Sequence, residues 1–181
     1  MVSNIDFSNF SGFFKTGIPN IVFYPSIILC IFLIFLGLFS SLIKEKKTFV
    51  FFVLFIEYLF IVISSTVLCR CDFAGARIEA TPFWDYIAIA NKMPGVSIWD
   101  IILNIVLFLP FGFLLSAVKP TLRLWVIVLL GLLFSFCIES MQYIFSKGIA
   151  QMDDLMHNSL GALLGVLMFK FMNKIVEHYR K

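Results

Sequence analysis

The feature that most constrains this chain is a series of long apolar runs that contain almost no charged residues. Residues 21–43 include no Asp, Glu, Lys or Arg, and each of four later runs includes one: 48–69, 98–118, 124–145 and 155–172. About 20 helical residues cross the roughly 30 Å hydrocarbon layer of a bilayer. Only a helix or a closed barrel satisfies its backbone groups there. The runs therefore predict about five transmembrane helices.

The composition agrees with this interpretation. Hydrophobic residues make up 61% of the 181 residues and the mean hydropathy is +1.00, whereas a soluble domain is about half apolar or less. A soluble core of this size would leave Phe and Ile runs exposed to water. We therefore predict an all-α, polytopic helical membrane protein in which residues 1–181 form a single membrane domain. No composition feature indicates a nucleic-acid partner.

The basic residues predict the orientation. One side of the predicted membrane has more of them, in short loops and at the C-terminal end: Lys44, Lys46, Lys47, Lys119, Arg123, Lys170, Lys174, Arg180 and Lys181. Cytoplasmic loops carry an excess of Lys and Arg. The N-terminus is therefore expected outside and the C-terminus in the cytoplasm. The aromatic connection 70–97 is expected to lie against the outer leaflet.

Polar residues gather near the outer ends of the last two helices. Glu139 and Gln142 share a helix face, as do Asp154 and Asn158. An ionisable group at the centre of a membrane costs about 2.5 kcal/mol or more, so it must face protein or water. These residues predict either an outward-opening polar site or a hydrogen-bonded clamp between helices without a ligand. Asp153 fits either this site or the N-terminal cap of the last helix.

Small residues continue the same two faces and predict close helix packing. Gly131 lies on the fourth predicted helix, and Gly161 and Gly165 form a G-x-x-x-G pattern on the fifth. Because a short loop joins these helices, they should be antiparallel neighbours. The spacing then predicts one register in which Gly131 faces Gly165 and Ser135 faces Gly161.

The third predicted helix adds Asp100 and Asn104 near its outer end, followed by Pro110 and Gly112. Proline frees a backbone carbonyl, so Pro110 predicts a kink that forms either a cavity wall or a packing bend. Glu57, about halfway along the second helix, is either a proton-relay residue or, as we favour, a partner in a buried hydrogen bond.

No metal site or cofactor is predicted. His157 and His178 have no second His or Cys at a spacing typical of metal ligands, and no nucleotide-binding or nucleophile motif is present.

The polar and small residues resemble a known pattern over residues 77–165, that of the VanZ-like family of bacterial membrane proteins. The chain matches N-x-x-L-F-x-P-x-G-F, E-x-x-Q and D-x-x-x-N-x-x-G-x-x-x-G in order, with the residues Asn104, Leu107, Phe108, Pro110, Gly112, Phe113, Glu139, Gln142, Asp154, Asn158, Gly161 and Gly165. Many members have Arg and Asp where this chain has Ile149 and Gln151.

The resemblance implies a multi-pass protein of the bacterial cytoplasmic membrane that reduces susceptibility to glycopeptide antibiotics of the teicoplanin type. The expected partners are membrane lipids and either a lipid-linked envelope precursor or the lipidated drug at the outer leaflet. Two alternatives stay open. One is an intramembrane enzyme that uses Glu139 and Asp154 as acid and base on a lipid-linked substrate. The other is a small proton-linked transporter.

Overall fold

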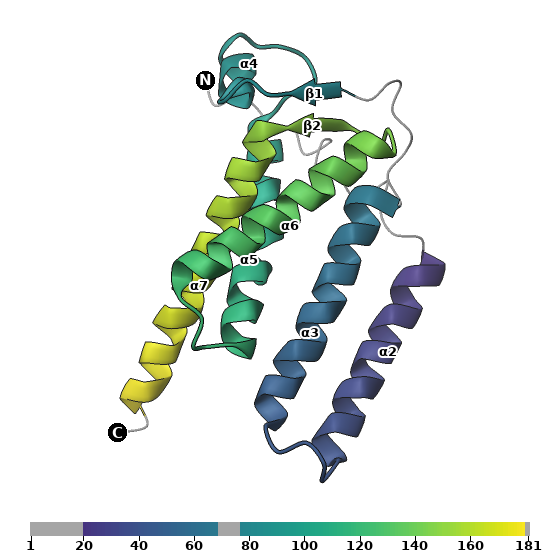
Figure 1. The fold of residues 1–181 in the computed structure, drawn as a ribbon, viewed down its shortest axis with the longest axis vertical. Coiled ribbons are helices and arrows are strands. Elements are labelled where there is room, and N and C mark those ends of the chain that lie inside the picture. Colours follow the sequence, from purple (N-terminus) through teal and green to yellow (C-terminus); the bar gives the residue numbers. More distant parts are fainter. Residues whose placement is uncertain (1–19, 69–76, 180–181) are drawn as a thin grey trace, which may run out of the picture.

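The computed structural model describes residues 20–68 and 77–179, and long helices dominate it (Figure 1). In chain order the elements are α2 (Asn20–Phe39), α3 (Lys46–Ile63), the π-helix η1 (Ser64–Leu68), β1 (Arg77–Glu79), α4 (Trp84–Ala90), α5 (Ile98–Val118), α6 (Leu124–Ile144), β2 (Ile149–Gln151) and α7 (Met152–Tyr179). Four helical segments are long and apolar enough to cross a membrane, and Phe23–Phe39 is a shorter apolar helix. The predicted all-α, multi-pass membrane fold is confirmed.

The helix bounds follow the apolar runs most closely in the middle of the chain. The third predicted helix coincides with α5, and α6 ends one residue before the predicted end. Helix α2 ends at Phe39, before the predicted residue 43, and α7 extends beyond 155–172 at both ends. The predicted end of the second helix, Cys69, lies outside the described residues. Because α7 begins at Met152, Asp153 and Asp154 lie in its first turn.

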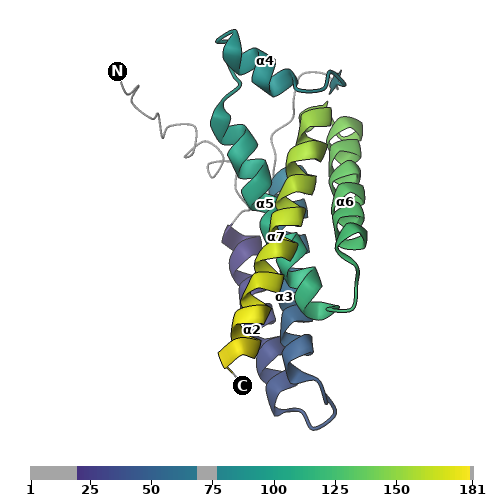
Figure 2. The same cartoon turned by 90° about the vertical axis from the view of Figure 1, so that its left-hand side faces the viewer.

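The closest helix pair is α5 and α7, and glycines set their separation. A Cβ atom at Gly161 would overlap the carbonyl oxygen of Ile105, and one at Gly165 would overlap that of Leu109. In the opposite direction, a Cβ at Gly112 would overlap the carbonyl oxygen of Ala162. Glycines on both helices therefore allow the two backbones to touch. Figure 2 shows α7 lying along both α5 and α6.

The predicted register between α6 and α7 is wrong. Ser135 accepts a hydrogen bond from Asn158 Nδ2 at 2.8 Å and does not face Gly161. A Cβ at Gly131 would lie 2.9 Å from the Cβ of Ala162, about one helical turn from the predicted partner Gly165. The physical reason is that α5 carries its own glycine, Gly112. Helix α5, and not α6, therefore packs against the face of α7 that carries Gly161 and Gly165.

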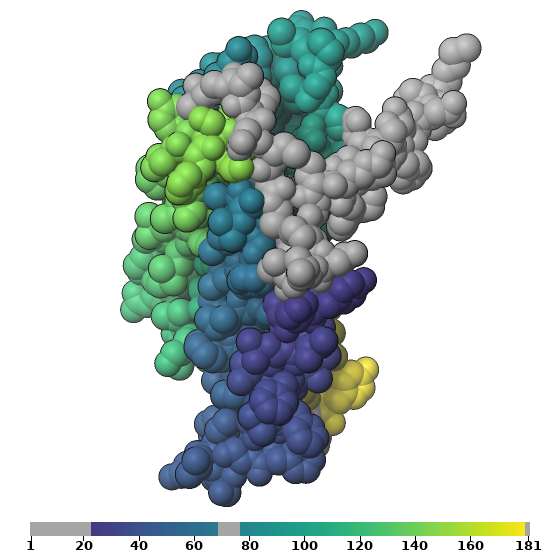
Figure 3. All heavy atoms as spheres, turned by 90° about the vertical axis from the view of Figure 1, so that its right-hand side faces the viewer, coloured from purple at the N-terminus to yellow at the C-terminus, as the bar shows by residue number. Residues whose placement is uncertain are grey.

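Aromatic packing and one buried hydroxyl tie α3 to this helix pair. The ring of Phe55 in α3 packs edge-on against Phe111 of α5, with the centroids 5.5 Å apart, beside the fully buried Phe108. Tyr58 of α3 donates a hydrogen bond to the Leu107 carbonyl at 2.8 Å, one turn before Pro110. The backbone next to the proline thus has a partner from a neighbouring helix. In Figure 3, α3 lies between α2 and α6.

One end of the bundle carries structure that the sequence did not predict. Strands β1 and β2 pair in parallel, with Arg77 opposite Ile149 and Glu79 opposite Gln151. Helix α4 lies at the same end (Figure 1) and buries Asp85. The basic-residue pattern predicts that this end faces the outside. The connection that we expected against the outer leaflet thus includes a helix and a strand that pack on the protein.

Candidate functional site

A cavity of about 520 Å³ opens between the helices at the end that carries α4 and the small sheet. All five residues of the predicted polar site line it: Asn104, Glu139, Gln142, Asp154 and Asn158. Asp100, which was predicted as an additional member, also lines it. Lys147, Ile149 and Gln151 contribute from the connection between α6 and α7. The structure therefore gathers the polar residues of three helices around one space.

Hydrogen bonds hold the two carboxylates of this wall in place. Asn104 Nδ2 of α5 donates to Asp154 Oδ1 of α7. The backbone N–H of Gln151 donates to Glu139 Oε2 at 3.1 Å, which links β2 to α6. A hydrogen bond to a carboxylate is stronger than one between neutral groups. Asp154 and Glu139 therefore have fixed positions on neighbouring walls of the cavity.

Two side-chain amides of the wall keep unused acceptors. Gln142 Nε2 donates to the Thr66 carbonyl in the π-helix η1 at 3.1 Å, and Asn158 Nδ2 donates to Ser135. The carbonyl oxygens Gln142 Oε1 and Asn158 Oδ1 are buried and have no hydrogen-bond partner among the described residues. Such atoms are rare, because leaving a buried acceptor unpaired costs about 1 to 3 kcal/mol. They favour a ligand that carries N–H or O–H donors.

Asp153 and Asp100 have structural contacts. Asp153 accepts hydrogen bonds from the backbone N–H groups of Phe83 at 2.7 Å and Asp85 at 2.8 Å, and so caps the first turn of α4. The sequence indicated a cap for its own helix, not for one 70 residues earlier. Asp100 forms a capping box with Ser97 at the start of α5.

Replacing Asp153 with alanine is expected to release α4 while leaving the helix bundle folded. The carboxylate satisfies two backbone donors, and losing a side-chain cap costs about 0.5 to 2 kcal/mol. We expect faster hydrogen exchange at the amides of residues 84–90 in the purified protein, with α5 and α7 unchanged. Glu177→Ala, at the exposed far end of α7, is the control. Unchanged exchange in α4 would show that the cap is unimportant.

Glu57 lies in a different pocket from the polar cavity. It accepts a hydrogen bond from Ser26 Oγ of α2 at 2.8 Å, in an apolar pocket of about 340 Å³ between α2 and α3. This contact agrees with a hydrogen-bonding role for Glu57, the one of the two roles that we favoured from the sequence. The structure does not bring Glu57 together with Asn104, Glu139 or Asp154 in one pocket.

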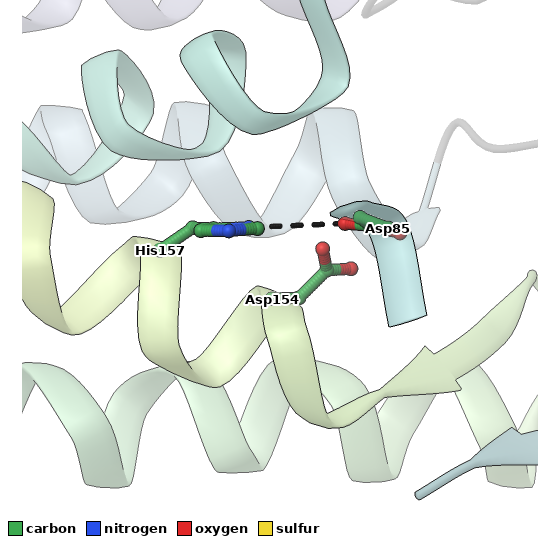
Figure 4. Close-up of side chains that lie close together, drawn as sticks. All are labelled: Asp85, Asp154 and His157. Carbon is green, nitrogen blue, oxygen red and sulfur yellow. Dashed lines mark ion pairs between the residues drawn. The ribbon is translucent and has the colours of Figure 1, made fainter. Parts of the chain in front are cut away.

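The sequence interpretation missed Asp85 and His157 as partners. His157 Nδ1 of α7 lies 3.9 Å from Asp85 Oδ2 of α4, and the possible ligand atoms of Asp85, Asp154 and His157 all lie within 4.8 Å of one another (Figure 4). Burial raises the pKa of the Asp85 carboxyl, the nearby Asp153 raises it further, and His157 opposes them. Local sequence patterns do not indicate this contact, because Asp85 and His157 are 72 positions apart in the chain.

The fold and cavity define a multi-pass helical membrane protein with a polar site at one end of its bundle. The model of the VanZ/LLP1 family matches residues 22–173, most of the described chain and more than the 77–165 stretch that carried the resemblance. The protein belongs to the VanZ/LLP1 family. No curated protein and no solved structure matches the chain significantly. Ile149 and Gln151, where we expected a departure from the family pattern, lie on the cavity wall.

Proposed function

We propose that this protein reduces susceptibility to glycopeptide antibiotics of the teicoplanin type by binding a lipid-linked envelope precursor or the lipidated drug at the outer leaflet. The observation that carries the proposal is the polar cavity between apolar helices, with the unpaired acceptors of Gln142 and Asn158 in its wall. A molecule with a lipid tail and a donor-rich head matches both the apolar helices and the polar cavity. Its tail stays in the bilayer while its sugar or peptide groups enter the cavity. The protein then acts in a bacterial cytoplasmic membrane.

Charge and size support this choice of ligand. The cavity volume lies within the range of about 300 to 1,000 Å³ that is typical of small-molecule sites. It holds a sugar or a few peptide units, not a whole glycopeptide, so the ligand must enter with one part only. Hydroxyl and amide donors can pair with the carboxylates of Glu139 and Asp154 as well as with the free amide oxygens.

Glycopeptide susceptibility in a bacterial host tests the proposal. Cells that express the wild type are expected to tolerate several-fold more teicoplanin than cells with an empty vector. Glu139→Gln keeps the side-chain volume but weakens the acceptor for Gln151, so it is expected to reduce this protection at an equal membrane level. The Glu177→Gln control removes a carboxylate outside the cavity. Equal susceptibility with and without the wild type would refute the drug-related part of the proposal.

The second candidate is an intramembrane enzyme with Glu139 and Asp154 as acid and base. The observation that favours it is that both carboxylates line one cavity from facing helices. Purified protein would then convert a lipid-linked precursor to a new product over many turnovers, and Glu139→Gln would abolish the conversion. Saturable binding without product formation favours the first candidate.

A further inference from the structure

Three side chains that are distant in the sequence converge where α4 meets the first turns of α7. Figure 4 shows the His157 ring pointing from α7 toward Asp85 of α4, with Asp154 beside them. Their possible ligand atoms lie within 4.8 Å of one another. Asp85 and His157 are only 3% and 4% exposed, so bulk water does not solvate these two side chains, whereas Asp154 is partly buried on the cavity wall.

The histidine has one satisfied and one unsatisfied nitrogen. Its Nε2 lies 3.1 Å from the hydroxyl oxygen of Tyr86. Its Nδ1 is buried and has no hydrogen-bond partner among the described residues, and it points at Asp85 from 3.9 Å. Metal-bound histidines have this arrangement, because one nitrogen faces the ion while the other is held by an outer partner.

The surroundings carry an excess of negative charge. The carboxylate of Asp153 lies close enough to raise the pKa of Asp85, and Asp100 acts in the same direction more weakly. Asp153 uses its oxygens for the amides of α4, and Asp154 accepts from Asn104. The donors in these bonds are uncharged amide groups, and the bonds orient the carboxylates. Buried charges are normally paired or coordinate a metal.

We propose that Asp85, Asp154 and His157 bind a divalent metal ion of the zinc class. Two carboxylate oxygens and one imidazole nitrogen suit zinc, whereas calcium and magnesium prefer oxygen ligands alone. Ligand atoms around a tetrahedral zinc ion lie roughly 3.4 Å apart, given zinc–ligand distances of about 2.0 to 2.2 Å. Side-chain movements of about 1 Å would therefore bring the three ligand atoms to the spacing that a zinc ion requires. Three protein ligands leave the fourth position open.

The open position gives the ion a role at the cavity. Asp85 and Asp154 belong to the cavity wall, together with Asp100 and Glu139, while Lys147 is the basic residue of the lining. An anionic headgroup would meet repulsion from these carboxylates. A bound zinc ion reverses the local charge and offers a coordination position to a phosphate oxygen. This role rests on the proposed function, because it makes the ligand a phosphorylated lipid; the metal site itself does not.

Metal binding to the purified full-length protein in detergent tests the site. The protein is stripped with a chelator and titrated with Zn²⁺, and bound metal is measured by calorimetry and elemental analysis. We expect about one equivalent per chain in the wild type. Even the loss of an outer histidine partner weakens metal sites about 10- to 100-fold, so His157→Gln and Asp85→Asn should weaken binding at least tenfold. Glu177→Gln should bind like the wild type.

Folding of each variant is verified by its helical circular dichroism and melting temperature. X-ray absorption of the zinc-loaded wild type gives a second readout that needs no variant, and it should show oxygen and nitrogen neighbours with an imidazole contribution. A wild type that binds no zinc, folded variants that bind it equally well, or a spectrum without imidazole would overturn the inference. Absent zinc binding with intact antibiotic protection would refute the metal site alone, whereas zinc binding without protection would refute the proposed function alone.

Discussion

Gly165→Ala is expected to lower the free energy of unfolding by about 3 kcal/mol or more, the upper part of the range for overpacked cores. The added methyl would overlap the carbonyl oxygen of Leu109 and would lie 2.8 Å from the backbone nitrogen of Phe113 and 3.1 Å from the Cα of Gly112. These neighbours are backbone atoms, which cannot rotate away. Helices α5 and α7 must therefore separate, and the contacts at Gly112 and Gly161 are lost with them.

Equilibrium unfolding of the purified protein in mixed micelles measures this loss. Gly131→Ala is the graded comparison, because its new methyl would meet the Ala162 side chain at 2.9 Å and the ring of Phe111 at 3.5 Å. The Cβ of Ala162 is fixed to the backbone of α7, but this overlap is smaller than the one at Gly165, so the helices need to move less and the loss should be smaller. A Gly165→Ala protein within about 0.5 kcal/mol of the wild type would contradict the observed α5–α7 contact, since this is the scale of an ordinary surface substitution.

Asp154→Asn is expected to remove most of the antibiotic protection while the protein stays folded. The substitution keeps the size of the side chain and an oxygen that can accept from Asn104 Nδ2. It removes the negative charge that faces the cavity. The bond from Asn104 weakens but remains as a neutral hydrogen bond, whereas a ligand loses the charge that it would pair with, so ligand binding is expected to suffer more than helix packing.

The measurement is teicoplanin susceptibility at matched membrane levels, with melting temperature as the check on folding. The control is Asn173→Ala, which removes a polar side chain from the exposed far end of the same helix. A folded Asp154→Asn protein with full protection would show that this wall of the cavity has no part in the function.

The transmembrane helices could be predicted because lipid imposes a local rule. Each uncharged run must be helical over its own length, and α5 follows its run from Ile98 to Val118. The same spacing placed Asn104, Glu139 and Asp154 near one end of the bundle. These features depend on residues close together in the sequence.

The features that could not be predicted depend on distant contacts. Spacing along α7 shows that Gly161 and Gly165 share a face, but not that this face packs on α5 instead of α6. Helix α4 is only seven residues long and is capped by Asp153 from a distant helix. The approach of His157 to Asp85 joins the same two segments, which are far apart in the sequence, so no local pattern revealed it.

The most direct test of the central claim is equilibrium binding of lipid-linked envelope precursor and of teicoplanin to the protein in lipid nanodiscs. The account predicts saturable binding of at least one of these by the wild type, at least about tenfold weaker binding by Asp154→Asn, and weaker binding of teicoplanin without its lipid tail; tenfold corresponds to about 1.4 kcal/mol. Wild-type protein that binds neither, or an Asp154→Asn protein that binds as tightly as the wild type, would contradict the claim that this polar cavity is the functional site.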